Sequence, residues 1–343
     1  MQSELTSYAQ SSAAAHQTEA PGDTFRVVVV MPVYQDWESV SLVCQSLDEH
    51  LGRLPNVEVR ILLVDDGSPE GTLGWSDFEV RTLLQIDVLR LRKNLGHQRA
   101  ICAGLCYVYE HITSNAVLVM DADGEARPED AARLIESMKA NPRGVLFAER
   151  RKRLEGVTFR VGYWVFRILH WLLTGIPVRV GNFSILCSSD LGRLTCMPEL
   201  WNHYAGAVFK SKVPFTCLPM DRGRRLRGRS KMDVPSLVAH GLAGIATFQE
   251  KVTTRILIAN AFCLLFLLIL LAGVIAIRLG TNLAVPGWAT YTVGLIVVLL
   301  TLILAVSFSL VFYVIGSRTV ALFIPVRDCP VFTRTLDNLA RRE

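Results

Sequence analysis

Residues 117–130 read VLVMDADGEARPED, a stretch that passes from an apolar run through a polar turn into a helix. The unbroken apolar run predicts a strand at 116–120 that is buried on both faces. Pro128 suits the first turn of a helix, and the acids after it complement the helix N-terminus, so a helix is expected at 128–140. Strand, turn and helix in this order are typical of a parallel α/β sheet.

Three carboxylates fill the turn: Asp121, Asp123 and Glu125. Acids this close repel one another unless a cation lies among them. Carboxylate oxygens bind divalent ions, so a metal ion is the candidate, and it would offset the charge of a diphosphate. Glu125 is open to two interpretations, because it is either a third ligand or an acid that merely complements the start of the helix.

The rest of residues 25–150 repeats this alternation of short apolar runs and helical patterns. Further strands are predicted at 26–31, 57–64, 86–91 and 144–148, and further helices at 38–51 and 96–110. The runs are continuously apolar, as in strands that are covered on both faces. We therefore expect an open, mostly parallel α/β sheet.

Unusual residues follow three of the predicted strands, as Pro32-Val33-Tyr34, Asp65-Asp66-Gly67-Ser68 and Asp121-Ala122-Asp123. In α/β sheets, ligands bind beyond the carboxyl ends of the strands. The first strand is not followed by GxGxxG and the chain has no GxxxxGK[ST], so neither a dinucleotide fold nor a P-loop is indicated. A carboxylate at Asp65 or Asp66 can accept a hydrogen bond from a base, and together with a metal at the third turn this indicates a nucleotide-sugar site.

Basic residues are clustered in a chain whose net charge is +5. Four lie at Arg150–Arg153, and six lie between Arg222 and Lys231. Local clusters favour phosphate-facing patches beside a membrane over a general nucleic-acid surface, so no nucleic-acid partner is expected. These groups either pair with a lipid phosphate whose hydrocarbon stays in the bilayer or anchor the chain to anionic lipids.

Two long uncharged runs contribute to the high hydrophobic fraction of 51%. Residues 256–277 and 291–316 are each long enough to cross a bilayer core of about 30 Å as a helix. The 13 residues between them carry one basic residue, whereas several basic residues flank the pair on both sides, so cytoplasmic flanks are predicted. Residues 1–24 lack the apolar core of a signal peptide and are expected to form a flexible tail.

Two further segments mix apolar and basic residues. The stretch at 157–177 fits a helix that lies in the membrane interface, and equally an amphipathic helix packed on the sheet. The stretch at 234–255 leads directly into the first apolar run. The eight cysteines form no CxxC pair, so in a reducing compartment we interpret them as small apolar residues.

Five motifs occur in the order VVVVMPVYQD, ILLVDDGSPEGT, NLGHQRAICAGL, VLVMDADGEARPED and RLRGRSKM. With the two apolar runs that follow, they resemble the family 2 inverting glycosyltransferases with a GT-A fold, which has a Rossmann-like sheet. The nearest branch is that of the polyprenyl-phosphate glycosyltransferases of the dolichyl-phosphate mannose synthase type. The resemblance covers about residues 25–316 and is more specific for the superfamily than for the branch.

The resemblance implies a site for a UDP- or GDP-sugar. The nucleoside would lie against Pro32, Tyr34, Asp36, Asp65, Asp66 and Gly67. Asp121 and Asp123 would form the DxD motif that holds Mg²⁺ or Mn²⁺ on the sugar diphosphate. Glu125 stands where that branch has a glutamine that also reaches the metal, so Glu125 is the third candidate ligand.

The resemblance also implies a polyprenyl-phosphate acceptor. The residues expected at its phosphate are Arg150, Arg153, Arg222, Arg225, Ser230 and Lys231. The expected catalytic residues are Asp121, Asp123, Arg150 and Arg225. Where the branch usually has an acid and an arginine, the chain has Asn182 and Ser184, a departure that bears on the identity of the sugar or the lipid.

These expectations describe a membrane-bound transferase with a cytoplasmic catalytic domain at 25–233, a juxtamembrane segment at 234–255, a membrane hairpin at 256–316 and a cytoplasmic tail at 317–343. Packing between hairpins is compatible with a homo-oligomer. A phosphate acceptor is already anionic at pH 7, so a single displacement with inversion needs no general base. Two alternatives stay open: transfer to another membrane lipid or lipid-linked glycan, and a non-catalytic membrane scaffold with a degenerate domain of this fold.

Overall fold

The structure is a computed structural model that describes residues 24–69, 80–150, 157–176, 180–220, 223, 234–281, 287–317 and 322–342. It divides into two compact units. The first contains the chain up to residue 160 together with 179–247 and the segment from 323 onward, and the second contains 161–178 and 248–322.

The first unit is built on a single sheet. Its strands are β1 (Phe25–Val33), β2 (Val57–Asp65), β3 (Gln85–Leu91), β4 (Ala116–Val119), β5 (Val145–Arg150), β6 (Val180–Cys187), β7 (Phe215–Met220) and β8 (Thr333–Arg341). They lie in the order β7-β5-β6-β4-β1-β2-β3-β8. β6 and β8 run antiparallel to their neighbours, and the other neighbouring pairs are parallel. The predicted fold class, a mostly parallel α/β sheet, is confirmed.

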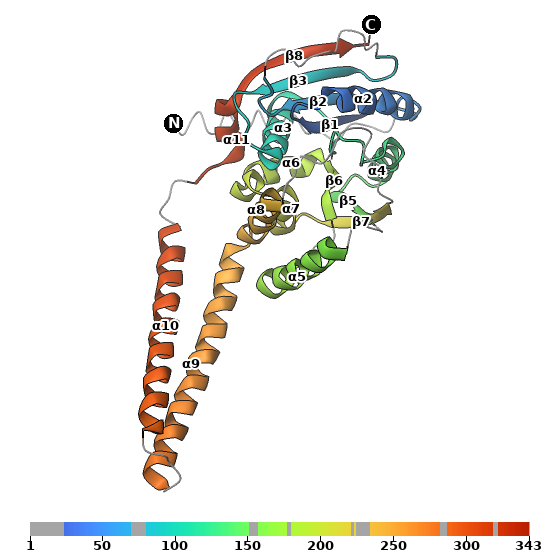
Figure 1. Cartoon of the computed structure of the whole chain (residues 1–343). Coiled ribbons are helices and arrows are strands. Elements are labelled where there is room, and N and C mark those ends of the chain that lie inside the picture. The colour runs from blue at the N-terminus through green and yellow to red at the C-terminus, as the bar shows by residue number, and fades with distance from the viewer. Residues whose placement is uncertain are drawn as a thin grey trace. The chain divides into compact units, whose positions relative to one another are not determined.

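Helices cover both faces of this sheet (Figure 1). They are α2 (Trp37–Leu51) and α4 (Pro128–Ala140) on one face, and α3 (His97–His111), α6 (Ser188–Thr195), η1 (Pro198–Trp201) and α7 (Tyr204–Ser211) on the other. Val27 and Val29 of β1 pack in the core beneath α2 and α4, whereas Val28 and Val30 pack in the core beneath α3. Because alternate residues are buried on opposite faces, the strands are continuously apolar.

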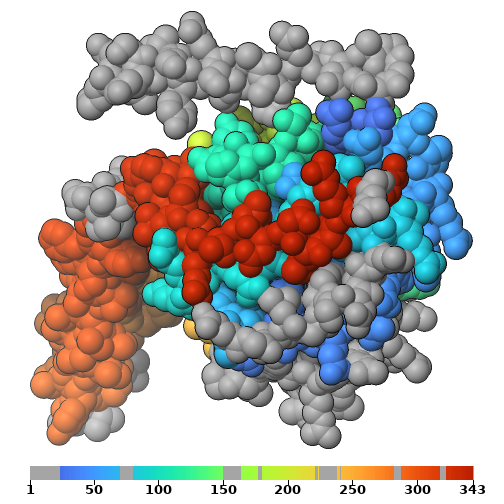
Figure 2. Space-filling model, turned by 90° about the horizontal axis from the view of Figure 1, so that it is seen from above, coloured from blue at the N-terminus to red at the C-terminus, as the bar shows by residue number. Residues whose placement is uncertain are grey.

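The last strand, β8, comes from residues that follow both long apolar helices. It pairs with β3 from Gln85 opposite Arg341 to Leu91 opposite Thr333 and so forms one edge of the sheet, and Figure 2 shows it at the surface alongside β3. The sequence predicts a tail at 317–343, and the structure adds that this segment contains β8. An edge strand exposes one side to water, so its sequence TRTLDNLAR lacks the apolar run that marks the inner strands.

The segment before β8 also packs on the first unit. It contains α11 (Pro325–Asp328) and η2 (Cys329–Phe332). The thiols of Cys102, Cys106 and Cys329 are buried within 4.8 Å of one another, which joins η2 to α3. Burial raises the pKa of the Cys102 thiol, which is therefore neutral. Hydrogen bonds with Cys102 and Cys106 instead lower the pKa of Cys329, and three such thiols are of a kind that can hold a metal ion. The interpretation of these cysteines as small apolar residues therefore stays a prediction.

The second unit contains α9 (Gln249–Gly280) and α10 (Trp288–Ser317), which pack against each other, and most of α5 (Val157–Thr174). By length and composition, Gln249–Gly280 and Trp288–Gly316 qualify as membrane-crossing helices, with mean hydropathies of 2.8 and 3.0. Asn260 Nδ2 donates to Ser307 Oγ at 3.0 Å, so a polar contact joins the pair. The predicted hairpin therefore has the form of two long apolar helices.

Hydrogen bonds join the end of α5 to the start of α9. Arg255 Nη1 donates to the carbonyl oxygens of Trp171 and Leu172, at 3.2 and 2.7 Å. A cation at the carboxyl end of a helix satisfies backbone acceptors that the helix leaves open. Trp164, Trp171 and Leu172 are nevertheless exposed, which is typical of a helix at a membrane interface and leaves that prediction standing. The predicted juxtamembrane segment at 234–255 contains α8 (Val234–Ala246) and the first residues of α9.

Candidate functional site

The turn after β4 holds two carboxylates at the carboxyl end of the sheet. Asp123 Oδ1 accepts a hydrogen bond from the Glu125 backbone N–H at 2.9 Å, which stabilises the turn. Asp121 Oδ1 lies 3.1 Å from His97 Nε2. Both aspartates are half-buried, whereas Ala122 between them packs in the core. The turn is thus anchored by its middle residue and keeps its acids partly accessible.

His97, the first residue of α3, completes this acidic turn. Burial opposes its charged form, but the carboxylates of Asp121, Asp123 and Asp66 outweigh burial and raise the pKa of His97. Asn182 Nδ2 lies 3.0 Å from His97 Nε2. Asn182, one of the two residues at which the chain departs from the family pattern, therefore contacts His97, which in turn contacts Asp121.

Asn182 and Ser184 have different surroundings. Gln98 Nε2 donates to Asn182 Oδ1 at 3.1 Å, which orients the amide. Ser184 Oγ is buried 2.9 Å from the hydroxyl of Tyr204. Asn182 thus belongs to the site, whereas Ser184 belongs to the core.

Asp66, in the turn after β2, is bonded to a neighbouring loop. Its two oxygens accept from the backbone N–H groups of Leu95, at 2.7 Å, and Gly96, at 2.9 Å. Burial raises the pKa of Asp66, although these hydrogen bonds oppose the shift. Because both oxygens already accept from the backbone, the contact that Asp66 makes is with the loop that leads to His97.

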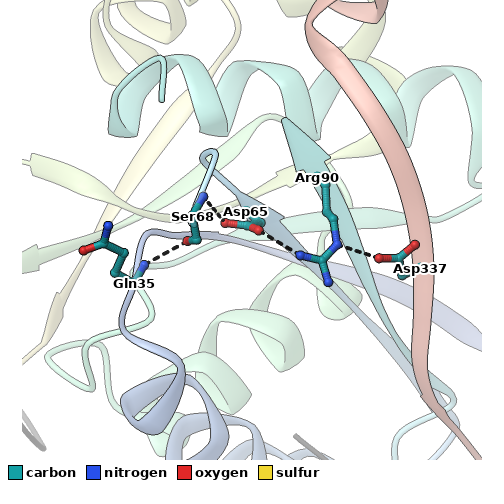
Figure 3. Close-up of polar contacts among 5 residues, drawn as sticks. All are labelled: Gln35, Asp65, Ser68, Arg90 and Asp337. Carbon is teal, nitrogen blue, oxygen red and sulfur yellow. Dashed lines mark hydrogen bonds and ion pairs between the residues drawn. The ribbon is translucent and has the colours of Figure 1, made fainter. Parts of the chain in front are cut away.

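Asp65 is also surrounded by protein donors (Figure 3). Its Oδ1 accepts from the backbone N–H of Ser68 at 3.0 Å, and its Oδ2 lies 3.4 Å from Arg90 Nη1. Ser68 Oγ in turn accepts from the Gln35 backbone N–H at 3.0 Å. The prediction that Asp65 or Asp66 accepts a hydrogen bond from a base stays a prediction. The structure adds that both acids hold neighbouring loops in place through hydrogen bonds to backbone N–H groups.

The loop after β1 provides the remaining residues predicted at the nucleoside. Pro32 is buried, Tyr34 is exposed, and Asp36 Oδ1 accepts from the hydroxyl of Ser39 at 2.8 Å at the start of α2. Gly67 has a positive φ of 70°, and a Cβ there would lie 2.5 Å from the carbonyl carbon of Lys93. Only glycine fits such a close approach of two loops.

Gly223 lies against the acidic turn. Its backbone N–H donates to the Glu125 carbonyl oxygen at 3.0 Å. A Cβ at Gly223 would lie 2.9 Å from both the Gly124 carbonyl oxygen and Arg127 Cγ, so the contact requires glycine. Gly223 follows Arg222 in the sequence, and it is the one residue between Arg222 and Lys231 that the structure describes.

The predicted acceptor residues themselves are mostly not described. Arg150 ends β5, but its side chain lies outside the described part of the chain. The residues wholly outside it are Arg153, Arg222, Arg225, Ser230 and Lys231. Their roles stay predictions.

Asp121 and Asp123 offer hard oxygen ligands of the kind that Mg²⁺ and Mn²⁺ prefer, and both are partly accessible, as is Glu125 in the same turn. Within the described residues, however, three potential ligand atoms lie close together at Cys102, Cys106 and Cys329 and not at this turn. The metal site at Asp121, Asp123 and Glu125 stays a prediction.

Sequence reasoning missed two residues that shape the site. His97 stands in the motif NLGHQRAICAGL without a role, although its place after the third strand puts it at the edge where the acids gather. Arg90 and Asp87 are charged residues in a strand whose other buried residues are apolar, and a charge in such a strand is the signal that would have found Arg90.

Comparison with known proteins shows what this chain is similar to. Residues 28–194 match the family described as Glycosyl transferase family 2. The chain is 24% identical over 314 residues to the uncharacterized glycosyltransferase YkcC of Bacillus subtilis (strain 168), which covers 89% of this chain and 91% of that protein. It is 24% identical over 236 residues to a bactoprenol glucosyl transferase of Shigella phage SfX, with coverage of 67% and 76%.

Among solved structures, the chain is similar to the mannosyltransferase PcManGT from Pyrobaculum calidifontis in complex with GDP-Man and Mn²⁺. The identity is 16%, the TM-score is 0.42, and the match covers 90% of this chain and 91% of that one.

Proposed function

Because this chain is a glycosyltransferase of family 2, we propose that it transfers a sugar from a nucleotide-sugar donor to a polyprenyl phosphate at the cytoplasmic face of a membrane. The observation that carries the proposal is the hydrogen bond from Gly223 to Glu125. It joins the start of a strongly basic segment to the turn that holds Asp121 and Asp123. A site for two phosphate-bearing substrates needs this juxtaposition, because both bring negative charge to the same place.

The acidic turn supports a metal-dependent donor site. Asp121 and Asp123 would hold Mg²⁺ or Mn²⁺, with Glu125 as the third candidate ligand. When bound, the ion supplies positive charge that stabilises the departing nucleoside diphosphate. His97 and Asn182 would orient Asp121 from the side, and the loops braced by Asp65 and Asp66 would receive the nucleoside.

The basic segment and the relatives support the acceptor. Arginine and lysine between Arg222 and Lys231 can pair with a phosphate, and Arg150 at the end of β5 would contribute from the sheet. Relatives that are named bactoprenol glucosyl transferases favour an acceptor of the polyprenyl class.

The chemistry follows from the charge of the acceptor. A phosphate monoester is anionic at pH 7 and attacks the anomeric carbon without a general base. The protein residues align it behind the scissile bond, which gives a single displacement with inversion at the sugar. Arg150 and Arg225 would hold the attacking phosphate, while the acidic turn holds the leaving group.

The position of β8 supports the topology of a hairpin. β8 follows α10 and pairs with β3, which precedes α9, so both ends of the helix pair return to one folded unit. If both helices cross the membrane, the segments before α9 and after α10 lie on the same side, as this pairing requires. If only one helix crossed, they would lie on opposite sides. The basic residues on both flanks assign the folded unit and both termini to the cytoplasm.

Release of nucleoside diphosphate by the purified full-length chain tests the proposal. The reaction contains Mn²⁺, one nucleotide sugar from a panel of UDP- and GDP-sugars, and a short-chain polyprenyl phosphate. We expect release that needs both the metal and the lipid phosphate, and a glycolipid product of inverted configuration. Release with diacylglycerol or a lipid-linked glycan, and none with polyprenyl phosphate, would replace this acceptor by another membrane lipid.

A further inference from the structure

Charged side chains from three strands meet beside the turn after β2 (Figure 3). In the sheet register Asp65 of β2 lies opposite Arg90 of β3, and Thr335 of β8 lies on the other side of Arg90. Asp337 is two residues further along β8 and so points to the same face. Arg90 contacts both acids, because its Nη1 lies 3.4 Å from Asp65 Oδ2 and its Nε donates to Asp337 Oδ2 at 2.6 Å.

The three side chains differ in burial. The Asp65 side chain is 2% exposed, that of Arg90 is 26% exposed, and that of Asp337 is 42% exposed. A buried carboxylate needs a partner, and Arg90 provides charge that offsets that of Asp65. Arginine has a long, flexible side chain, so the contact with Asp337 restricts the orientation in which it meets Asp65.

Hydrogen bonds also connect Asp65 to the loop after β1. Asp65 accepts from the Ser68 backbone, and Ser68 Oγ accepts from the Gln35 backbone. Gln35 has a φ of 53°, an uncommon conformation for a residue other than glycine, which the surrounding contacts must hold. Gln35 lies between Tyr34 and Asp36, which are predicted at the nucleoside.

We propose that β8 contributes to binding of the donor. Asp337 positions Arg90, and Arg90 positions Asp65 and the loop around Gln35 so that they receive the nucleoside of the donor. This inference rests on the proposed function, because it assigns the nucleoside to these loops. It makes the segment after the hairpin a contributor to donor binding, with Asp337 and Arg90 as positioning residues.

The matching control is the next residue of the same strand. Asn338 Nδ2 donates to Asp87 Oδ1 at 3.1 Å, and Asp87 pairs with Arg60 at 2.6 Å. Neighbouring residues of a strand point to opposite faces, so this contact joins β8 to β3 on the face away from Asp65. Asn338→Ala therefore removes a contact of β8 and leaves the contacts of Arg90 with Asp337 and Asp65 intact.

The test is calorimetric titration of UDP and of GDP, each with Mn²⁺, into the detergent-solubilised full-length chain. For whichever nucleotide binds the wild type, Asp337→Ala should weaken binding by about two- to fivefold, the range expected for loss of a partly exposed charge pair. The donor KM should rise by the same factor at unchanged kcat. Asp337→Asn should also weaken binding, Asp337→Glu should recover most of it, and Asn338→Ala should leave it unchanged.

Two outcomes would overturn the inference. If Asp337→Ala and Asn338→Ala weaken binding equally, or both leave it at the wild-type value, β8 acts only in stability. If Asp337→Ala does not fold, the same comparison is made with Asp337→Asn and read in the same way. Absence of nucleotide binding by the wild type is a different result, because it contradicts the proposed function itself.

Discussion

Two turns at the same edge of the sheet carry paired acids, and they use them differently. After β2, Asp65 and Asp66 are 2% and 3% exposed, and their oxygens contact donors of the protein. After β4, Asp121 and Asp123 are half-buried and partly accessible to solvent. The first pair shapes the loops of the site, whereas the second is suited to bind an ion.

The difference arises from what lies next to each turn. A loop passes over the turn after β2 and offers its backbone N–H groups to Asp66. The turn after β4 is approached by the side chain of His97 and by the backbone of Gly223. The acids of the two turns therefore differ in their partners, which are backbone N–H groups of another loop at Asp66 and the His97 side chain at Asp121.

The largest effect is expected for the turn after β4. Asp123→Ala should lower kcat/KM by on the order of 100-fold or more, because the donor diphosphate loses a ligand of its metal. The melting temperature should change little. Diphosphate release and thermal unfolding, measured on the same preparation, check both statements, and full activity of the variant would refute the metal assignment.

The opposite result is expected for the turn after β2. Asp66→Ala leaves the backbone N–H groups of the half-buried Leu95 and Gly96 without their acceptor, so the unfolding free energy should fall by about 2 kcal/mol. Denaturant unfolding measures this loss. Asp121→Ala is the control at the other turn, and an equal loss in that variant would remove the distinction between the two turns.

A third prediction decides whether Glu125, in the turn after β4, is a metal ligand or a helix-start acid. If it is a metal ligand, Glu125→Gln should raise the Mn²⁺ concentration for half-maximal activity by about tenfold, as loss of a charged ligand does. Glu129→Gln is the control, since Glu129 lies in the first turn of α4 and acts as a helix-start acid. Equal and small effects of the two variants would make Glu125 a helix-start acid as well.

The smallest effect concerns pH and a third acid that braces a loop. Asp48 is buried and accepts from the backbone N–H groups of Arg81, Thr82 and Leu83. Burial opposes the charged form, but these hydrogen bonds prevail and hold the pKa of Asp48 below its usual value. Its stabilisation is therefore present above the ordinary pKa of about 3.9 and is lost as pH falls through the lower pKa of the folded state.

Melting temperatures of wild type and Asp48→Asn between pH 6 and pH 3 check this sign. The advantage of the wild type should shrink toward pH 3. An advantage that grows toward pH 3 would contradict it.

Much of the architecture was predictable because it depends on local pattern. Continuous apolar runs mark strands buried on both faces, and helix 128–140 is observed at its predicted bounds because Pro128 and the acids after it specify a helix start. β8 could not be found in this way, since an edge strand of mixed polarity has no distinctive period.

The sequence alone determined that acids stand at the ends of buried strands, that basic residues cluster in two places, and that two long apolar runs follow. Each of these is a property of neighbours along the chain. Only the tertiary structure decided which acids are occupied by protein donors, that Gly223 meets Glu125, and that the C-terminal segment returns through Asp337 to Arg90. These contacts join residues about 100 and 250 positions apart, and such pairings arise from packing of the whole sheet, which no local pattern records.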